Sequence, residues 1–95
     1  MWKTIEAYPD YEVNTQGEVR RKNNKRLLKP CITASGYYRV NLRKDKKSYT
    51  AYIHRLVAET FLSKAIDDVE VNHKDGDKSN NHVENLEWTS HAQNV

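Results

Sequence analysis

The first part of the chain alternates short extended segments with turns. Residues 11–14 and 17–20 flank a two-residue connection, an arrangement typical of a tight hairpin with Asn14 and Gly17 as turn formers. A further short extended run, Arg26–Lys29, ends at a proline, which cannot donate a hydrogen bond to a central strand. This region is therefore predicted to consist of short strands broken by turns.

A second hairpin is predicted from residues 36–42 and 47–53, because apolar residues recur there at every second position on either side of a charged tip. Its predicted buried face holds Tyr38, Val40, Leu42, Tyr49, Ala51 and Ile53. Its opposite face holds Tyr37, Arg39, Asn41, Ser48, Thr50 and Tyr52. Such a mixture of bases, amides, hydroxyls and rings suits contacts to nucleic acid, and an ordinary solvent-facing side of a sheet is an equal alternative.

The pattern then changes to the period of a helix. Residues 54–62 are predicted to be helical, with an apolar face made by Leu56, Val57, Phe61 and Leu62. An acidic connection, a short strand, a long polar loop and a second short strand follow, with Val71, Leu86 and Trp88 as core residues. A last helix is predicted to be capped by Thr89 or Ser90, with Gln93 completing a capping box, and to include His91 and Asn94. The fold class is therefore predicted to be α+β, with small antiparallel hairpins followed by a helix and a strand–strand–helix unit.

The net charge of +3 hides two opposed halves. Residues 1–60 contain 13 Lys and Arg against 6 Asp and Glu, a charge of +7, whereas residues 61–95 contain 3 against 7, a charge of −4. The bases between positions 20 and 47 face a single acid, Asp45; they are Arg20, Arg21, Lys22, Lys25, Arg26, Lys29, Arg39, Arg43, Lys44, Lys46 and Lys47. A polyanion is the natural partner of such a stretch, although a lone charge run is more often a solvated face.

Length and composition set further limits. A chain of 95 residues, 37% hydrophobic and 31% charged, is expected to form one small domain, or two very small modules sharing a core, rather than a multidomain enzyme. The core is expected to be thin. The single cysteine, Cys31, excludes an internal disulfide and a multi-cysteine zinc site. Because no apolar run reaches bilayer length and the first residues lack a signal-peptide layout, we expect no membrane association, no secretion and an intracellular location.

Several spaced motifs together resemble one nuclease family. The C-terminal part contains His54-Arg55-Leu56-Val57-Ala58 with Phe61, Val71-Asn72-His73-Lys74-Asp75-Gly76, Asn80-Asn81, Asn85-Leu86-Glu87-Trp88 and Asn94. This set resembles the HNH endonuclease motif, the ββα-metal or His-Me finger fold, in the form found in phage and mobile-intron homing enzymes. The segments Trp2–Ile5, Tyr11–Val13 and Gly17–Arg20 resemble a small DNA-binding module that often precedes such nucleases. The implied division is a basic β-rich module over 1–53 and a helix plus ββα-metal catalytic unit over 54–95, packed as one unit.

The resemblance implies roles for individual residues. His73 matches the histidine that acts as general base on the attacking water, a role that suits the imidazole side chain at neutral pH. Asn85 matches the central asparagine that holds the loop and orients the histidine, while Asn72 and Asn94 match the metal ligands. Because neighbouring strand residues point to opposite faces, Asn72 and His73 require a twisted or bulged strand end to reach one phosphate. His91 is expected to contact a DNA phosphate or to support the metal ligands.

The implied ligands are oxygen donors, which suit one Mg²⁺ or Mn²⁺ ion per site better than zinc. An EF-hand starting at Asp75 fails because Asn80 and Leu86 stand where it needs Gly and Glu. The expected partner is double-stranded DNA, bound through the bases and amides Arg20, Arg21, Lys22, Lys25, Arg26, Arg39, Asn41 and Arg43. His54 and Arg55 are expected either to join this surface or to brace the sheet.

The function expected from these observations is metal-dependent hydrolysis of DNA phosphodiester bonds inside a bacterial or phage-infected cell. A monomer with one site makes a nick, and cutting both strands requires a homodimer or two binding events. The alternative is a DNA-binding module that is truncated or has lost catalysis, because only one residue follows Asn94 in the chain.

Overall fold

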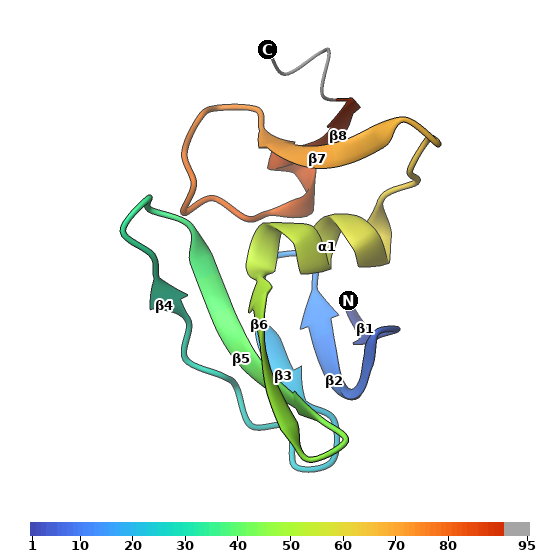
Figure 1. Ribbon diagram of the computed structural model, residues 1–95, viewed down its shortest axis with the longest axis vertical. Helices are drawn as coiled ribbons and strands as arrows, with labels where there is room; N and C mark the ends of the chain where they lie inside the picture. The colour runs from blue at the N-terminus through green and yellow to red at the C-terminus, as the bar shows by residue number, and fades with distance from the viewer. Residues whose placement is uncertain (91–95) are drawn as a thin grey trace.

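The computed structural model describes residues 1–90. It contains three small antiparallel sheets grouped around one α-helix (Figure 1). In chain order the elements are β1 (Trp2–Ile5), β2 (Tyr8–Asn14), β3 (Val19–Arg21), β4 (Cys31–Ile32), β5 (Tyr38–Lys44), β6 (Lys47–Tyr52), α1 (Ile53–Phe61), β7 (Asp68–His73), the 3-10 turn η1 (Val83–Asn85) and β8 (Leu86–Ser90). The predicted α+β class is confirmed.

The first sheet has the order β1-β2-β3. The predicted hairpin between β2 and β3 is present, and its turn is organised by Asn14, whose side-chain oxygen accepts from the backbone N–H groups of Gln16 at 3.0 Å and Glu18 at 2.9 Å. Gly17 has φ +86°, a conformation that side chains rarely adopt. The run Arg26–Lys29 forms only an isolated bridge between Leu27 and Arg20, so the strand predicted there is absent from the described structure.

The second sheet has the order β4-β5-β6 and contains the second predicted hairpin. Asp45 and Lys46, at φ 52° and 66°, make its two-residue turn, whose positive φ values match the twist of the strands. Val40, Leu42 and Ala51 are buried as predicted. Tyr49, predicted on the buried face, is 40% exposed; it lies on the edge strand and packs its ring against Tyr8 at 5.9 Å.

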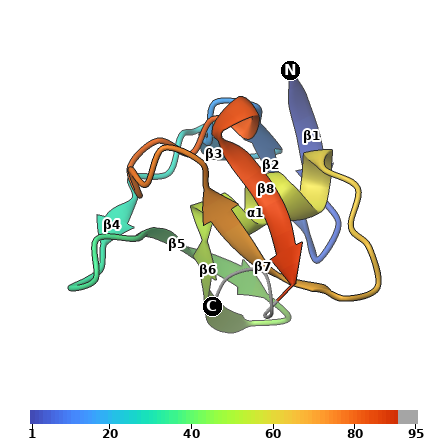
Figure 2. The same cartoon turned by 90° about the horizontal axis from the view of Figure 1, so that it is seen from above.

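Helix α1 lies between the two N-terminal sheets and the β7–β8 ribbon (Figures 1 and 2). Its apolar face enters one core that is shared by all three sheets. The buried residues of this core are Ile5, Tyr11, Val13, Val19, Val40, Leu42, Ala51, Ile53, Leu56, Val57 and Leu86. Residues from both predicted parts of the chain therefore contribute to this core.

The third sheet is the ribbon of β7 and β8, joined by the long polar loop 74–85, which includes η1. Its irregularity lies between Asp68 and Glu70, whereas the sequence suggested a distorted end near His73. Thr89 and Ser90, the predicted caps of a last helix, lie in β8. The predicted helix with His91 and Asn94 falls outside the described residues. Among residues 1–90 no helix has the length and apolarity needed to cross a bilayer.

Candidate active site at the end of strand β7

The candidate general base lies at the C-terminal end of β7 and is enclosed by its surroundings. His73 is 7% exposed, and its Nε2 lies 2.8 Å from Oδ1 of Asn81, which is 6% exposed. Because a carbonyl oxygen can only accept, Nε2 is the donor in this contact, and in the neutral ring the lone pair is then on Nδ1. From the sequence Asn85 was expected to orient His73; the direct contact is instead made by Asn81.

A group of rings surrounds His73. The ring of His54, from the start of α1, lies 5.1 Å from that of His73, and the ring of Tyr37 lies 5.1 Å from His54 and 6.2 Å from His73. Tyr52 adds a fourth ring at 5.7 Å from His54. These residues come from the hairpin, the helix and the ribbon, so the ring of His73 is held by tertiary packing.

His54 is the most perturbed titratable group of this ring cluster. It is 8% exposed, and its Nδ1 is a buried atom without a hydrogen-bond partner among the described residues. Burial lowers the pKa of His54 to about 4, with smaller contributions from the charges of His73 and Arg55. His54 is therefore neutral at pH 7.

Asn85 closes the polar loop. Its amide nitrogen donates to Asp75 Oδ1 and to the backbone oxygen of Asn80, both at 2.9 Å, while its Oδ1 accepts from the Asp75 N–H at 3.2 Å. The backbone oxygen of Asn85 also accepts from the Lys74 N–H at 2.7 Å. Hydrogen bonds from the Asp77 backbone N–H and from the side chains of Asn80 and Asn85 lower the pKa of Asp75, so the carboxylate that Asn85 binds stays charged. Asn85 thus fixes the loop that follows His73.

Asn72 lies next to His73 and faces a carboxylate across the ribbon. Its amide nitrogen donates to Glu87 Oε1 at 3.2 Å, and Asn72 pairs with Glu87 in the β7–β8 register. Among residues 1–90 its Oδ1 makes no hydrogen bond, so this oxygen can serve a cation. Glu87 was not singled out from the sequence; the antiparallel pairing of the two predicted strands was the pattern that could have found it. The second predicted ligand, Asn94, and the supporting residue His91 lie outside the described residues.

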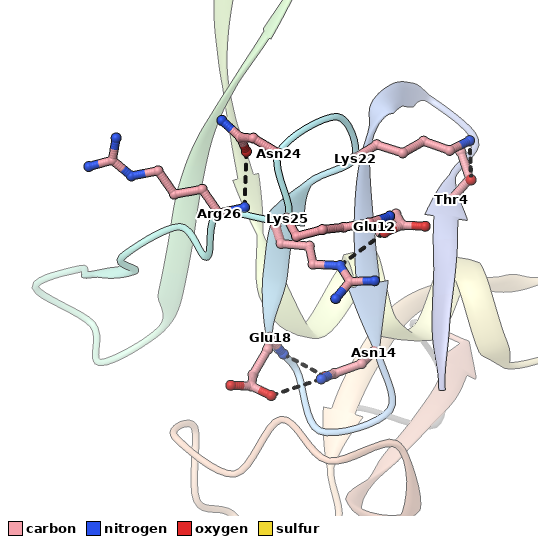
Figure 3. A network of polar contacts seen from close by, with 9 residues as sticks. Thr4, Glu12, Asn14, Glu18, Lys22, Asn24, Lys25 and Arg26 are labelled. Atoms are coloured by element: carbon pink, nitrogen blue, oxygen red, sulfur yellow. Dashed lines mark hydrogen bonds and ion pairs between the residues drawn. The ribbon is translucent and has the colours of Figure 1, made fainter.

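Most predicted DNA-binding bases of the first sheet are engaged within that sheet (Figure 3). Arg20 bonds Glu12 at 3.0 Å and stacks 3.8 Å from the centre of the Trp2 ring. Lys25 lies 3.5 Å from the same carboxylate, and Lys22 donates to Thr4 Oγ1 at 2.9 Å. Arg20 and Lys25 lower the pKa of Glu12 through these contacts. These contacts give Arg20, Lys22 and Lys25 a structural role in holding the sheet together.

The remaining predicted bases are arranged differently. Arg39, Asn41 and Arg43 alternate on the exposed face of β5, and their register partners on β6 are Tyr52, Thr50 and Ser48. Thr50 donates to Asn41 Oδ1 at 3.3 Å. Arg21 lies 5.8 Å from the Tyr11 ring, and Arg26 is exposed. The hairpin thus presents the predicted row of basic and polar side chains to solvent.

His54 and Arg55 make contacts within the protein and do not belong to this row. His54 packs in the ring cluster described above. Arg55 donates to the Val69 backbone oxygen at 3.1 Å and stacks 5.5 Å from the Trp88 ring. Trp88 in turn donates from Nε1 to the Ala58 oxygen at 3.3 Å. These contacts favour the bracing role over the DNA-contact role for both residues.

A β-ribbon with a histidine at the end of its first strand, an asparagine beside it and a loop latched by a further asparagine is the arrangement of an HNH-type nuclease fold. Comparisons with known proteins agree. Residues 51–95 match the HNH endonuclease family model and residues 1–43 match the NUMOD4 motif. The chain therefore contains an HNH endonuclease domain over residues 51–95, with a NUMOD4 motif in front of it.

Similar proteins include phage and viral enzymes. The chain is 40% identical over 95 residues to DNA endonuclease I-HmuI of Bacillus phage SP01, matching 99% of this chain and 55% of the relative. It is 40% identical over 94 residues to an uncharacterised HNH endonuclease of Acanthamoeba polyphaga mimivirus, matching 99% of this chain and 28% of the relative. The chain also superposes on a solved structure of the HNH homing endonuclease I-HmuI, described as showing its DNA binding and cleavage. The TM-score is 0.90 at 40% identity, over 100% of this chain and 55% of that one. The chain thus spans about a quarter to just over half of the length of these relatives.

Proposed function

We propose that this chain is a metal-dependent DNA endonuclease that hydrolyses phosphodiester bonds, with His73 as the general base. The observation that supports this most is the enclosed His73, held through Nε2 by Asn81 at the end of the β7–β8 ribbon in a fold that matches a solved HNH homing endonuclease. The Nε2-protonated ring has its lone pair on Nδ1, which is the atom that can take a proton from water. The expected products have 5′-phosphate and 3′-hydroxyl ends.

The oxygen donors of Asn72 and Glu87 fit a divalent cation. The Oδ1 of Asn72 is an oxygen donor that the described residues leave unused, and Glu87 places a carboxylate beside it. Oxygen donors suit Mg²⁺ or Mn²⁺, and Asn94 is the proposed second ligand. When bound, the ion supplies electrostatic stabilisation for the charge that develops on the phosphate and on the departing oxygen.

The basic β5–β6 hairpin is the proposed DNA-binding surface. Arg39, Asn41 and Arg43 lie in one exposed row, and hydroxyls and a tyrosine lie opposite them on β6. Cations in such a row neutralise phosphates, and the amide and ring add short-range contacts. The phage relatives support action inside an infected bacterial cell. One active site per chain is expected to nick, and double-strand cutting would need two protomers or two binding events.

A second candidate function is DNA binding without cleavage. It is favoured by the neutral Asn72, since an amide binds a divalent ion more weakly than a carboxylate does. The two functions differ in one observable: only the nuclease converts supercoiled DNA to open circles.

The test incubates supercoiled plasmid with the purified chain in Mg²⁺, in Mn²⁺ and in EDTA. The nuclease proposal predicts open circles with either metal, none in EDTA and none with His73→Ala. The matched control is His82→Ala, which removes a histidine from the same polar loop whose described contact is a cap to the Glu84 N–H. Gel-shift binding by the wild type without nicking in either metal would overturn the nuclease proposal and establish the binding module.

A further inference from the structure

The turn between β2 and β3 touches the loop that supports His73. The Thr15 backbone oxygen accepts from the Val83 N–H at 2.8 Å, although 68 positions separate the two residues in the chain. At Gly17 a Cβ atom would lie 2.9 Å from Cβ of Asn81 and 3.1 Å from its backbone oxygen. The turn with Asn14 lies against the faint orange loop in Figure 3. The N-terminal module therefore packs directly on the residue that holds the base.

Asn81 connects this turn to the active site. It is 6% exposed, and its backbone lies so close to Gly17 that a Cβ atom there would clash with it. Its side-chain oxygen lies 2.8 Å from His73 Nε2. The turn itself is rigid, because Asn14 ties it through two backbone contacts and through a 2.8 Å bond from its amide nitrogen to Glu18. A shift of the turn would therefore move Asn81, and with it the acceptor for Nε2.

We propose that Asn81 is a positioning residue for His73, and that the Asn14–Gly17 turn of the N-terminal module holds Asn81 in place by packing against it (the backstop role of the turn). The turn fixes Asn81, Asn81 fixes the Nε2-protonated tautomer of His73, and the lone pair on Nδ1 is thereby directed to the reacting water. This inference rests on the proposed role of His73. It gives the N-terminal module a task in catalysis in addition to DNA binding.

The first test removes the acceptor. Asn81→Ala is expected to lower the single-turnover rate of nicking about 10- to 100-fold while the Kd for DNA stays at the wild-type value, as for other residues that orient a catalytic histidine. Asn81→Asp keeps an oxygen acceptor and is expected to recover most of the rate. A wild-type rate for Asn81→Ala, or a rate that Asp does not restore, would overturn the proposal.

The second readout does not depend on cleavage. The ¹⁵N chemical shifts of the His73 ring, assigned by their absence in His73→Gln, report which nitrogen is protonated. The wild type is expected to show a protonated Nε2 and an unprotonated Nδ1, and Asn81→Ala a mixture of tautomers. Unchanged shifts in Asn81→Ala would contradict the inference. If the wild type shows the expected shifts and yet does not nick DNA, the proposed function fails while the positioning by Asn81 stands.

The third test addresses the turn with a matched glycine pair. Gly17→Ala and Gly36→Ala both place a side chain at positive φ, +86° and +90°, but the new Cβ at position 36 meets only a Lys78 side-chain carbon at 3.5 Å, an ordinary contact. Gly17→Ala is expected to slow nicking about tenfold more than Gly36→Ala and to perturb the His73 shifts, because it displaces Asn81. Equal rates and equal shifts for the two variants would refute the backstop role, and the Asn81 variants test the positioning role even if Gly17→Ala unfolds.

Discussion

Acidification is predicted to destabilise the fold through His54. The pKa of this buried imidazole is about 4 in the folded chain, against 6.5 as its ordinary value. Between these two values the unfolded chain binds the proton and the folded chain does not, so the free energy of unfolding falls as the pH falls from 6.5 towards 4. Above pH 6.5 His54 is neutral in both states and contributes no such penalty.

The size of the effect follows from the two pKa values. Proton linkage for this single group lowers the free energy of unfolding by ~2 kcal/mol between pH 7 and pH 5, at 1.36 kcal/mol per pKa unit of fully developed shift. The pKa values of Asp75, Asp77 and Glu12 are lowered, so these carboxylates reduce the free energy of unfolding mainly when the pH falls below their ordinary pKa values near 4. A comparison of pH 7 with pH 5 therefore reports mainly on His54.

The assay is urea unfolding followed by tryptophan fluorescence at pH 7 and pH 5. His54→Phe keeps a ring in the cluster but cannot be protonated, so its pH-dependent destabilisation should be smaller than that of the wild type by ~2 kcal/mol. Val57→Ala, on the same helix, is the control, because it should lower stability equally at both pH values. Equal destabilisation of His54→Phe and the wild type between pH 7 and pH 5 would refute the role of His54.

Three further outcomes are expected. Replacing Arg39 and Arg43 by Ala should weaken DNA binding and reduce the slope of log K against log salt by ~0.9 for each phosphate that is no longer neutralised, measured by fluorescence anisotropy; an unchanged slope would show that the hairpin is not the DNA-binding surface. Glu87→Gln should raise the Mn²⁺ concentration needed for half-maximal binding, followed by the EPR signal of free Mn²⁺ in the presence of DNA, because it removes the negative charge beside Asn72; a metal affinity equal to that of the wild type would disprove this influence. Asn85→Ala should lower the free energy of unfolding by ~1–3 kcal/mol and expose the loop to proteases, and a variant as resistant as the wild type would contradict its role as the latch.

The hairpins and the helix could be predicted from the sequence because local pattern determines them. Alternation placed Val40 and Leu42 inside, and Asn14 with Gly17 marked the first turn. Tyr49 shows the limit of alternation, because the pattern gives the face of a strand but burial also requires a neighbouring layer. On edge strand β6 its ring packs against Tyr8 and stays 40% exposed.

The supporting contacts of the site could not be predicted in the same way. The motif marked His73 and Asn85, but the contact between Asn81 and His73 depends on how the loop folds back, and the close approach of Gly17 to Asn81 depends on packing between distant segments. Charge counting also assigned Arg20 to DNA, whereas the β2–β3 register places it opposite Glu12. That pairing was accessible from the predicted hairpin, because the turn fixes which residues face one another.

The central claim is that His73 acts as the base in DNA cleavage. Its most direct test compares the single-turnover rate of plasmid nicking by the wild type and by His73→Ala, with both proteins saturating the DNA so that binding differences are removed. We predict equal occupancy of the DNA and a rate at least ~100-fold lower for the variant, the usual effect of removing a general base. A variant that nicks as fast as the wild type would contradict this role of His73.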